Sequence, residues 1–336
     1  MSRVDRNKES SKAPSTDVRL PAGEKAPSGS LVKLVLASLL AALVLVAFWL
    51  IFGWLALAPG DADSLVDSLS QDGRSRWRAA VDLARLLRQP GSAALKRDPA
   101  LLRRIAAILD NEIDAGLVHR DQITLRVYLC RALGEFHIAD GLPTLLKAVR
   151  TQRDERAADV RRSAIEAIAV LAANVGPGEL RADPEVVPVV LEATEDEHAT
   201  VRSAAAFALG VIGSPEAEAG LEKMLDDEHP DVRYNAAIGL ARQGNAKTVD
   251  TLLEMLDPDQ LAGVAVEEQE PARPFKRTMI LVNALRATRL LASANTTVDL
   301  DRLAEAVRRL ARGNVEQAVR LQAAEVLNEL DDRAKK

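Results

Sequence analysis

The sequence is poor in the residues that build disulfide frameworks, stacking surfaces and catalytic centres. Its 336 residues include a single cysteine, Cys130, with three tryptophans, two tyrosines and five phenylalanines. One thiol can form neither an internal disulfide nor a CxxC site. So few aromatic rings disfavour a β-sandwich or barrel and a base-stacking surface. The chain also has no nucleophile elbow, phosphate-binding Gly-rich loop, HExxH motif or catalytic pair of carboxylates. We therefore expect no enzyme active site.

What the chain does contain points to an all-α protein. Apolar residues make up 48% and charged residues 28% of the sequence, and the commonest types, such as Ala, Leu, Arg and Glu, favour helices. Residues 1–33 hold seven Lys/Arg and four Asp/Glu, so the totals of 44 and 49 leave 37 basic and 45 acidic residues in the remainder. An acidic body lacks the basic stripe that nucleic-acid binding needs. We expect no nucleic-acid partner.

The N-terminal part predicts a tail and a membrane anchor. Residues 1–30 are polar and basic without apolar periodicity, which is typical of a disordered tail. Residues 34–58 contain no charge, a run long enough to cross a bilayer as a helix. We place a transmembrane helix at 31–58. A cleaved signal peptide is the alternative, but the polar region before the run and the run itself are too long, and Pro59 would follow the cut.

The residues flanking the span predict its orientation. Basic residues precede it and acidic residues follow it, with no Lys or Arg until Arg74. They are Arg19, Lys25 and Lys33 before the span, and Asp61, Asp63 and Asp67 after it. Basic flanks remain on the cytoplasmic side. We expect a single-pass membrane protein with a cytoplasmic N-terminus and an extracytoplasmic body.

The body consists of internal repeats. The segment from Val201 to Leu209 aligns on the segment from Val232 to Leu240 with a shift of 31 residues. The same frame, Val-Arg followed by Ala and Leu, gives seven units. The other copies begin at Leu125-Arg126, Val160-Arg161 and Val319-Arg320, with weaker ones at Trp77-Arg78 and Lys276-Arg277.

This pattern of an acidic turn, Val-Arg, Ala and Ala-Leu-Gly resembles the HEAT repeat, and its closest copies resemble the bilin-lyase-like subtype. The resemblance covers residues 61–331. It implies an α-solenoid of about seven helix pairs, whose concave face, lined by the helices that begin with Val-Arg, docks proteins and peptides.

The resemblance also implies a ladder in which a turn carboxylate accepts hydrogen bonds from the Arg of the next helix. The expected members of this ladder are structural. In each case an acidic or amide residue precedes the Arg by six residues. The pairs are Asp196 with Arg202, Asp227 with Arg233, Asn314 with Arg320, and Glu155 with Arg161.

Positions that point away from the Ala/Leu seam are candidates for a partner-binding face. They are Arg162, Glu166, Ser203, Tyr234 and Asn235. A segment of eighteen residues, 257–274, interrupts the sixth repeat and is either a partner-binding element or a disordered insertion.

Some HEAT-like enzymes bind a di-iron centre through four His-Glu pairs, but this chain has only two pairs, in reversed order, at Glu197-His198 and Glu228-His229. Cys130 falls at an apolar position of a repeat helix, where we expect it to be buried as a small apolar side chain. We expect no metal or other cofactor.

The function predicted from these features is a membrane-tethered scaffold or accessory subunit that binds proteins at or near the membrane. A HEAT-like lyase or metal-dependent enzyme and an inert spacer are the alternatives.

Overall fold

The computed structural model describes Leu39 and residues 60–334, apart from 72, 74–75, 117–118, 152–154 and 260–261. All of these residues except Leu39 belong to one compact unit, Pro59–Lys336. The predicted tail at 1–30 lies outside the described residues, and so does the predicted span at 31–58 apart from Leu39. Within the described part of the chain, no helix is both long enough and apolar enough to cross a membrane.

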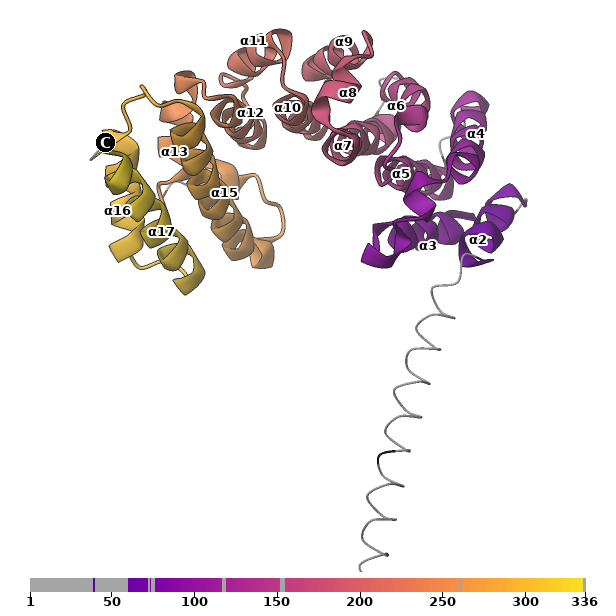
Figure 1. The fold of residues 1–336 in the computed structure, drawn as a ribbon, viewed down its shortest axis with the longest axis horizontal. Coiled ribbons are helices and arrows are strands. Elements are labelled where there is room, and N and C mark those ends of the chain that lie inside the picture. Colours follow the sequence, from indigo (N-terminus) through magenta and orange to yellow (C-terminus); the bar gives the residue numbers. More distant parts are fainter. Residues whose placement is uncertain are drawn as a thin grey trace, which may run out of the picture. The chain divides into compact units, whose positions relative to one another are not determined.

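The unit Pro59–Lys336 is built from helices in two layers (Figure 1). The outer layer comprises α2 (Gly60–Ser70), α4 (Pro99–Ala115), α6 (Leu142–Val149), α9 (Val186–Glu192), α11 (Pro215–Met224), α13 (Val249–Met255) and α16 (Asp301–Arg312). The inner layer comprises α3 (Arg76–Arg88), α5 (Arg120–Gly134), α7 (Ala158–Val175), α10 (Ala199–Ile212), α12 (Pro230–Gln243), α15 (Arg273–Ala294) and α17 (Gln317–Ala334). Each outer helix packs on the inner helix of the same repeat. The expected all-α solenoid is confirmed.

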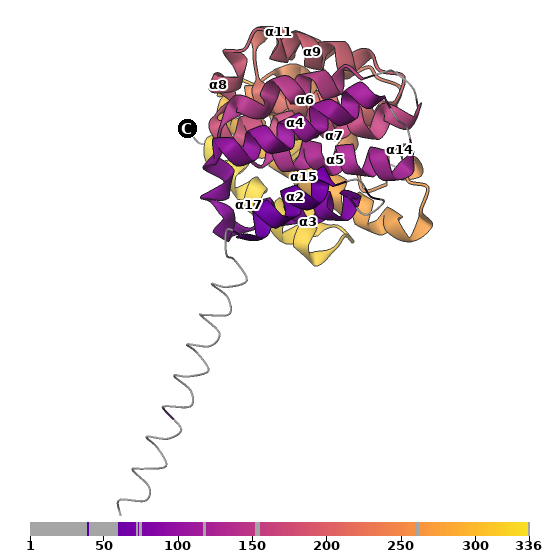
Figure 2. The ribbon, with the colours of Figure 1, turned by 90° about the vertical axis from the view of Figure 1, so that its right-hand side faces the viewer.

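The inner helices contact one another in chain order, from α3 through α5, α7, α10, α12 and α15 to α17. Figure 1 shows them along the inner side of an arc. In Figure 2 the neighbouring helices α4, α5, α6 and α7 run side by side. Each inner helix is thus covered on its outer side and flanked on both edges, except at the two ends of the series.

Local sequence signals set the limits of these helices. The Ser214 hydroxyl accepts from the Ala217 N–H at 3.0 Å and so caps α11. Helix α12 begins with Pro230 at its first position and ends at Gln243. The next residue, Gly244, caps it with a φ of 78°, the left-handed conformation that glycine adopts without strain. These are the Pro and Gly breaks that separate the repeats in the sequence.

Small residues allow neighbouring inner helices to approach closely. A Cβ added at Gly210 of α10 would lie 2.6 Å from the Cα of Gly239 in α12. A Cβ added at Gly134 of α5 would lie 2.8 Å from the Cα of Ala167 in α7. The inner layer therefore packs backbone against backbone at these crossings.

The inserted segment contains two short helices, α14 (Ala262–Ala265) and the 3-10 turn Glu270–Ala272. Helix α14 contacts α12 and α15, and Val264 is buried. A side chain at Gly263 would overlap the ring of Tyr234. Helix α14 thus packs on the solenoid, whereas residues 268–271 of the insertion are exposed.

The buried apolar residues form two clusters. The first extends from Ala62 to Leu240, and the second from Tyr234 to Leu330. Helix α12 supplies residues to both clusters: Val232 and Ala236 to the first, and Tyr234 to the second. The boundary between the clusters therefore runs through α12.

Candidate functional site

A ladder of arginines connects successive repeats. Arg161 of α7 donates through Nε and Nη2 to the two carboxylate oxygens of Asp196, at 2.8 and 3.0 Å. Both side chains are only 2% exposed. Two parallel charge-assisted bonds satisfy both groups in this buried position.

The next rung has the same form. Arg202 of α10 donates to both carboxylate oxygens of Asp227, at 2.8 and 3.0 Å, and to the backbone carbonyl of Asp196 at 3.0 Å. The carboxylate of Asp196 is therefore bound by the arginine of the preceding repeat, and not by Arg202 six residues later. Arg233 likewise donates to the Asp227 carbonyl. Arg202 and Arg233 each bond a carboxylate further along the chain and the backbone of their own turn.

The ladder has members that the sequence pattern does not identify. Arg76 of α3 bonds the Leu69 carbonyl at 2.6 Å and the Glu112 carboxylate at 2.7 Å. Arg233 bonds Glu254 of α13 at 2.9 Å. In both cases the carboxylate lies on a helix and not in a turn, so the spacing of acidic turns could not reveal it.

Two positions of the ladder differ from the rest. Arg126 of α5 is 4% exposed, and among the described residues its Nε and Nη2 have no hydrogen-bond partner. Burial lowers the pKa of this guanidinium. At the C-terminal end, Arg320 donates to the Val315 carbonyl at 2.9 Å. Asn314, the expected partner of Arg320, is exposed.

Helix α15 has no arginine in the ladder. The amide of Gln322 donates to the Val282 carbonyl at 3.5 Å, and Asn235 makes the equivalent bond to the Ser203 carbonyl at 3.2 Å. This equivalence aligns Val282 with Ser203. It places Leu281, which is buried, where the preceding inner helices carry arginine.

The ladder carboxylates make stability depend on pH. Burial alone would raise the pKa of Asp196 and Asp227, but hydrogen bonds from Arg161 and Arg202 and from backbone N–H groups hold both pKa values below their usual range. A lowered folded-state pKa stabilises the fold above the unfolded-state pKa of about 3.9, and this stabilisation is lost as the pH falls through the folded-state value.

We therefore expect the free energy of unfolding to fall steeply below about pH 4. Urea unfolding at a series of pH values checks this. The Asp227→Asn variant should be less stable near neutral pH and should show a shallower fall in acid. An unchanged slope in that variant would contradict a contribution from Asp227.

The structure separates the five positions that sequence analysis assigns to a binding face. Arg162 and Glu166 lie on the inner side of α7, with side chains 34% and 41% exposed. Ser203 accepts from the Asn235 amide at 2.9 Å, so this pair joins α10 to α12. Tyr234 is 4% exposed.

Tyr234 is placed differently because the inserted segment covers it. Its hydroxyl donates to Glu254 at 2.8 Å, and α14 packs on its ring. Burial, followed by the bond to Glu254, raises the pKa of its phenol. The interpretation of Tyr234 as an exposed face residue was wrong.

Apolar side chains of three neighbouring inner helices form what we call the inner-face patch. It consists of Val170 of α7, Phe207 and Val211 of α10, and Ile238 of α12. Val170 is 38% and Phe207 39% exposed, and the other two are half-buried. Because α10 is covered by α9 and α11 and flanked by α7 and α12, an exposed side chain in its middle faces the inner side of the arc.

Repeat positions align these residues in two rows. Phe207 and Ile238 each lie six residues after the Val of their own repeat, and Val170 and Val211 each lie ten residues after it. Since the positions differ by four residues, the two rows are one helical turn apart. Sequence analysis could have found them by comparing equivalent positions, because Phe207 aligns with Glu166.

Charged residues bound the patch at both ends. Glu166 lies one turn before Val170. At the other end Arg242 is exposed and donates to the Gly210 carbonyl at 3.0 Å. Arg286 occupies on α15 the position of Ile238, is exposed, and has no carboxylate partner among the described residues. An apolar centre with a charged rim is the usual composition of a protein interface.

The residues considered for chemistry do not come together. Within the described part of the chain, no three His, Cys, Asp or Glu side chains form a group that could hold a metal. The ring of His229 accepts a hydrogen bond from the Asp231 N–H and so caps the N-terminus of α12. Burial raises the pKa of the Cys130 thiol to about 12, so this cysteine stays protonated and inert at neutral pH.

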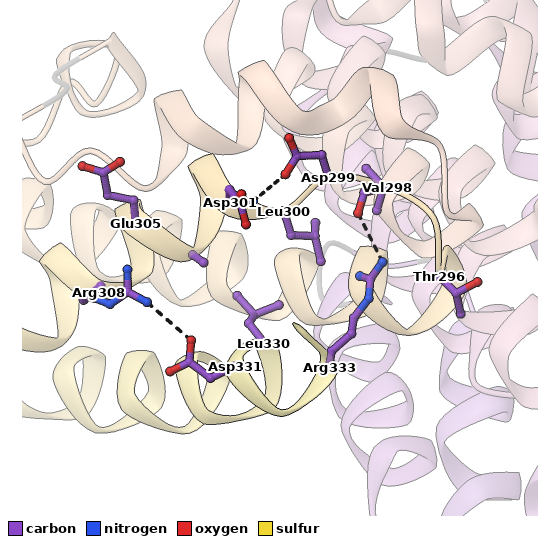
Figure 3. Close-up of a pocket in the computed structure, with 11 residues that line it drawn as sticks. Thr296, Val298, Asp299, Leu300, Asp301, Glu305, Arg308, Leu330, Asp331 and Arg333 are labelled. Carbon is purple, nitrogen blue, oxygen red and sulfur yellow. Dashed lines mark hydrogen bonds and ion pairs between the residues drawn. The ribbon is translucent and has the colours of Figure 1, made fainter. Parts of the chain in front are cut away.

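A groove of about 690 Å³ lies at the C-terminal end, between the loop before α16 and helix α17 (Figure 3). Arg308 faces Asp331 at 3.4 Å, and Arg333 donates to the carbonyls of Ala292, Asn295 and Val298. Both cations are therefore satisfied within the fold.

Comparison with known proteins agrees with the repeat pattern. The HEAT repeats family matches residues 187–267, and the HEAT-like repeat family matches residues 158–212. The chain contains HEAT repeats. The matched segments hold the inner-face patch and the central rungs of the ladder. No curated protein sequence matches this HEAT-repeat chain.

Two solved structures align over much of the chain. One is an engineered protein from the Northeast Structural Genomics Consortium, with 18% identity, a TM-score of 0.36, and coverage of 81% of this chain and 97% of its own. The other is human deoxyhypusine hydroxylase in complex with glycerol, with 19% identity, a TM-score of 0.29, and coverage of 81% and 96%. Both TM-scores are below 0.5, so neither structure informs the function of this chain.

Proposed function

We propose that this HEAT-repeat protein is a non-catalytic scaffold or accessory subunit, tethered to a membrane, that binds a protein partner through the inner-face patch. The observation that carries the proposal is this apolar surface with charges at both ends. Val211 and Ile238 pack in part against the core, but the exposed surface of Val170 and Phe207 is not used by it. They gain burial only when another molecule covers them.

The charges at the ends of the patch indicate what the partner presents. Arg242 and Arg286 lie on adjacent inner helices without a carboxylate partner among the described residues. Unneutralised cations beside an apolar surface favour a partner with carboxylates next to its apolar anchors. Phe207, as the aromatic side chain of the patch, is the natural anchor position.

The membrane part of the proposal rests on the sequence. The uncharged run at 34–58 and its flanking charges support a single span with the N-terminus in the cytoplasm and the repeats on the other side. A tether of this kind confines the repeats to partners at or near the same membrane.

Co-purification tests the binding function. The full-length protein is isolated from gently solubilised native membranes, and its partners are identified by mass spectrometry. We expect Phe207→Asp to lower recovery of the partner by at least ten-fold, since truncating an interface anchor typically costs about 2 kcal/mol or more.

Phe275→Asp is the matched control, because Phe275 is 74% exposed and lies outside the patch. The same change there should leave recovery unaltered. Equal recovery with both variants would favour an inert spacer, and a bound pigment or metal in the purified protein would revive the enzyme alternative.

A labelling experiment tests the topology separately. Ser68 is exposed on α2, so Ser68→Cys in a Cys130→Ser background offers one accessible thiol. A membrane-impermeant maleimide should label it in intact cells, whereas Ser11→Cys in the same background should react only after lysis. The reverse pattern would place the repeats in the cytoplasm.

A further inference from the structure

A groove at the N-terminal end of the inner layer is not explained by partner binding at the inner-face patch. It has a volume of about 590 Å³ and lies between α3 and α5. The half-buried ring of Trp77 and the buried side chain of Leu125 give it an apolar part, and Arg76, His119, Arg120 and Asp121 give it a polar part.

The cations around this groove differ in how they are paired. Arg76 is neutralised by Glu112 at 2.7 Å. Arg78 lies over the Trp77 ring at 5.4 Å from its centre and has no carboxylate partner among the described residues. Arg120 is exposed and likewise makes no ion pair within the described part of the chain. Asp121 is the carboxylate among the described lining residues. Among the described residues, the groove and its edge thus carry two arginines without an ion pair and one carboxylate.

Trp77 is half-buried, packs against the core and lines the groove. An indole ring combines a large apolar body with one polar N–H, and such rings concentrate at the level of lipid headgroups. Arginines beside such a ring offer bidentate bonds to phosphate. The groove thus combines an apolar wall for the upper part of a lipid with cations for its headgroup.

The position of the groove in the sequence favours a lipid over a soluble anion. Helix α2 begins at Gly60, two residues after the end of the proposed span at Ala58. In the proposed tethered protein, the first repeat, α2 with α3, directly follows the span along the chain.

We propose that the groove formed by Trp77, Arg120 and Leu125, with Arg78 beside it, binds the phosphate headgroup of an anionic membrane lipid. This inference rests on the membrane tether of the proposed function. Docking of this groove holds the first repeat against the membrane surface.

Quenching of Trp77 by brominated lipid tests the proposal on the full chain. Trp49→Phe and Trp54→Phe leave Trp77 as the one tryptophan. The protein is reconstituted in vesicles of acyl-brominated phosphatidylcholine, with or without one quarter acyl-brominated phosphatidylglycerol. We expect quenching of Trp77 emission that is strong with phosphatidylglycerol and weak without it.

The variant Arg78→Gln/Arg120→Gln should lower the equilibrium constant for docking of the groove on the vesicle surface about thirty-fold. Each arginine near an anionic surface raises this constant about five-fold. Arg309→Gln/Arg312→Gln removes the same charge from exposed positions of α16 and should change nothing. Quenching that is absent in every vesicle, or equal in both variants, overturns the proposal.

Two further measurements separate the possible causes of failure. Inorganic phosphate added to the detergent-solubilised protein should not shift Trp77 emission; a shift that the double variant abolishes would make the groove a site for free anions and overturn the lipid assignment. Carbonate extraction of membranes tests the tether alone. A chain released by carbonate lacks the proposed span, whatever Trp77 does.

Discussion

Replacing Asp196 with alanine is expected to lower the free energy of unfolding by about 3–5 kcal/mol, because the substitution leaves a buried arginine without its counter-charge. The side chains of Arg161 and Asp196 are each 2% exposed, so water cannot replace the lost bonds. Urea unfolding followed by circular dichroism measures the change.

The exposed pair of Arg302 and Asp250 provides the control. Its side chains are 68% and 82% exposed, and removing such a pair costs less than about 1 kcal/mol. Similar losses in Asp196→Ala and Asp250→Ala would contradict the role of the buried rung. Adding Arg161→Met to Asp196→Ala should restore part of the stability, because no unpaired charge then remains.

Gly210→Ala should produce the second large effect. The new Cβ would meet the Cα of Gly239 at 2.6 Å, and backbone atoms cannot move aside as the end of a side chain can. Overpacking of this kind costs about 1–3 kcal/mol. Because α10 and α12 carry Phe207 and Ile238, forcing these helices apart should also weaken partner recovery.

Gly178→Ala is the matched control. Gly178 lies in the short helix α8 (Pro177–Arg181), and the nearest atom to an added Cβ is the Arg181 side chain at 3.8 Å. Alanine there should be neutral or stabilise by up to about 1 kcal/mol. If the two glycine variants had equal melting temperatures, the close crossing of α10 and α12 would not limit stability.

The repeat architecture could be read from the sequence because the helices repeat their packing contacts. Val201 and Val232 are buried at the same depth in successive units, as are Leu209 and Leu240. A shift of 31 residues aligns all four. Side chains that face the core at regular spacing produce a repeating pattern of apolar residues. This is why the sequence alone predicted about seven helix pairs.

The predicted Val-Arg alignment of the repeats was wrong at the first and sixth units, because in both a basic residue near the arginine position points away from the ladder. In the first unit, Arg76 forms the rung in place of Arg78. In the sixth, Leu281 stands at the arginine position, four residues after Arg277. Helix α15 continues N-terminally beyond its repeat frame and carries Arg277 there. A basic residue beside an apolar one looks the same in sequence whether it points to a carboxylate or to solvent.

The proposed binding face was harder to predict than the fold. The residues next to Phe207 do not distinguish an exposed Phe from a buried one; only its alignment with Glu166 in the neighbouring repeat indicates that it is exposed. Tyr234 was misplaced because a segment some thirty residues later in the chain, α14, covers it. Contacts between distant segments have no periodicity, so only the assembled structure reveals them.

The division of the core within α12 has a mechanical consequence. The boundary lies within α12, and Leu281 interrupts the arginine ladder one helix later, on α15. Charged contacts still join α12 to the following helices, because Arg233 bonds Glu254 of α13 and Lys276 of α15 pairs with Asp231. Because α12 contributes side chains to both clusters, the last two repeats pack on the rest of the unit mainly through this one helix. In the proposed tethered protein, a pulling force on a partner bound to the last two repeats would reach the membrane mainly through α12.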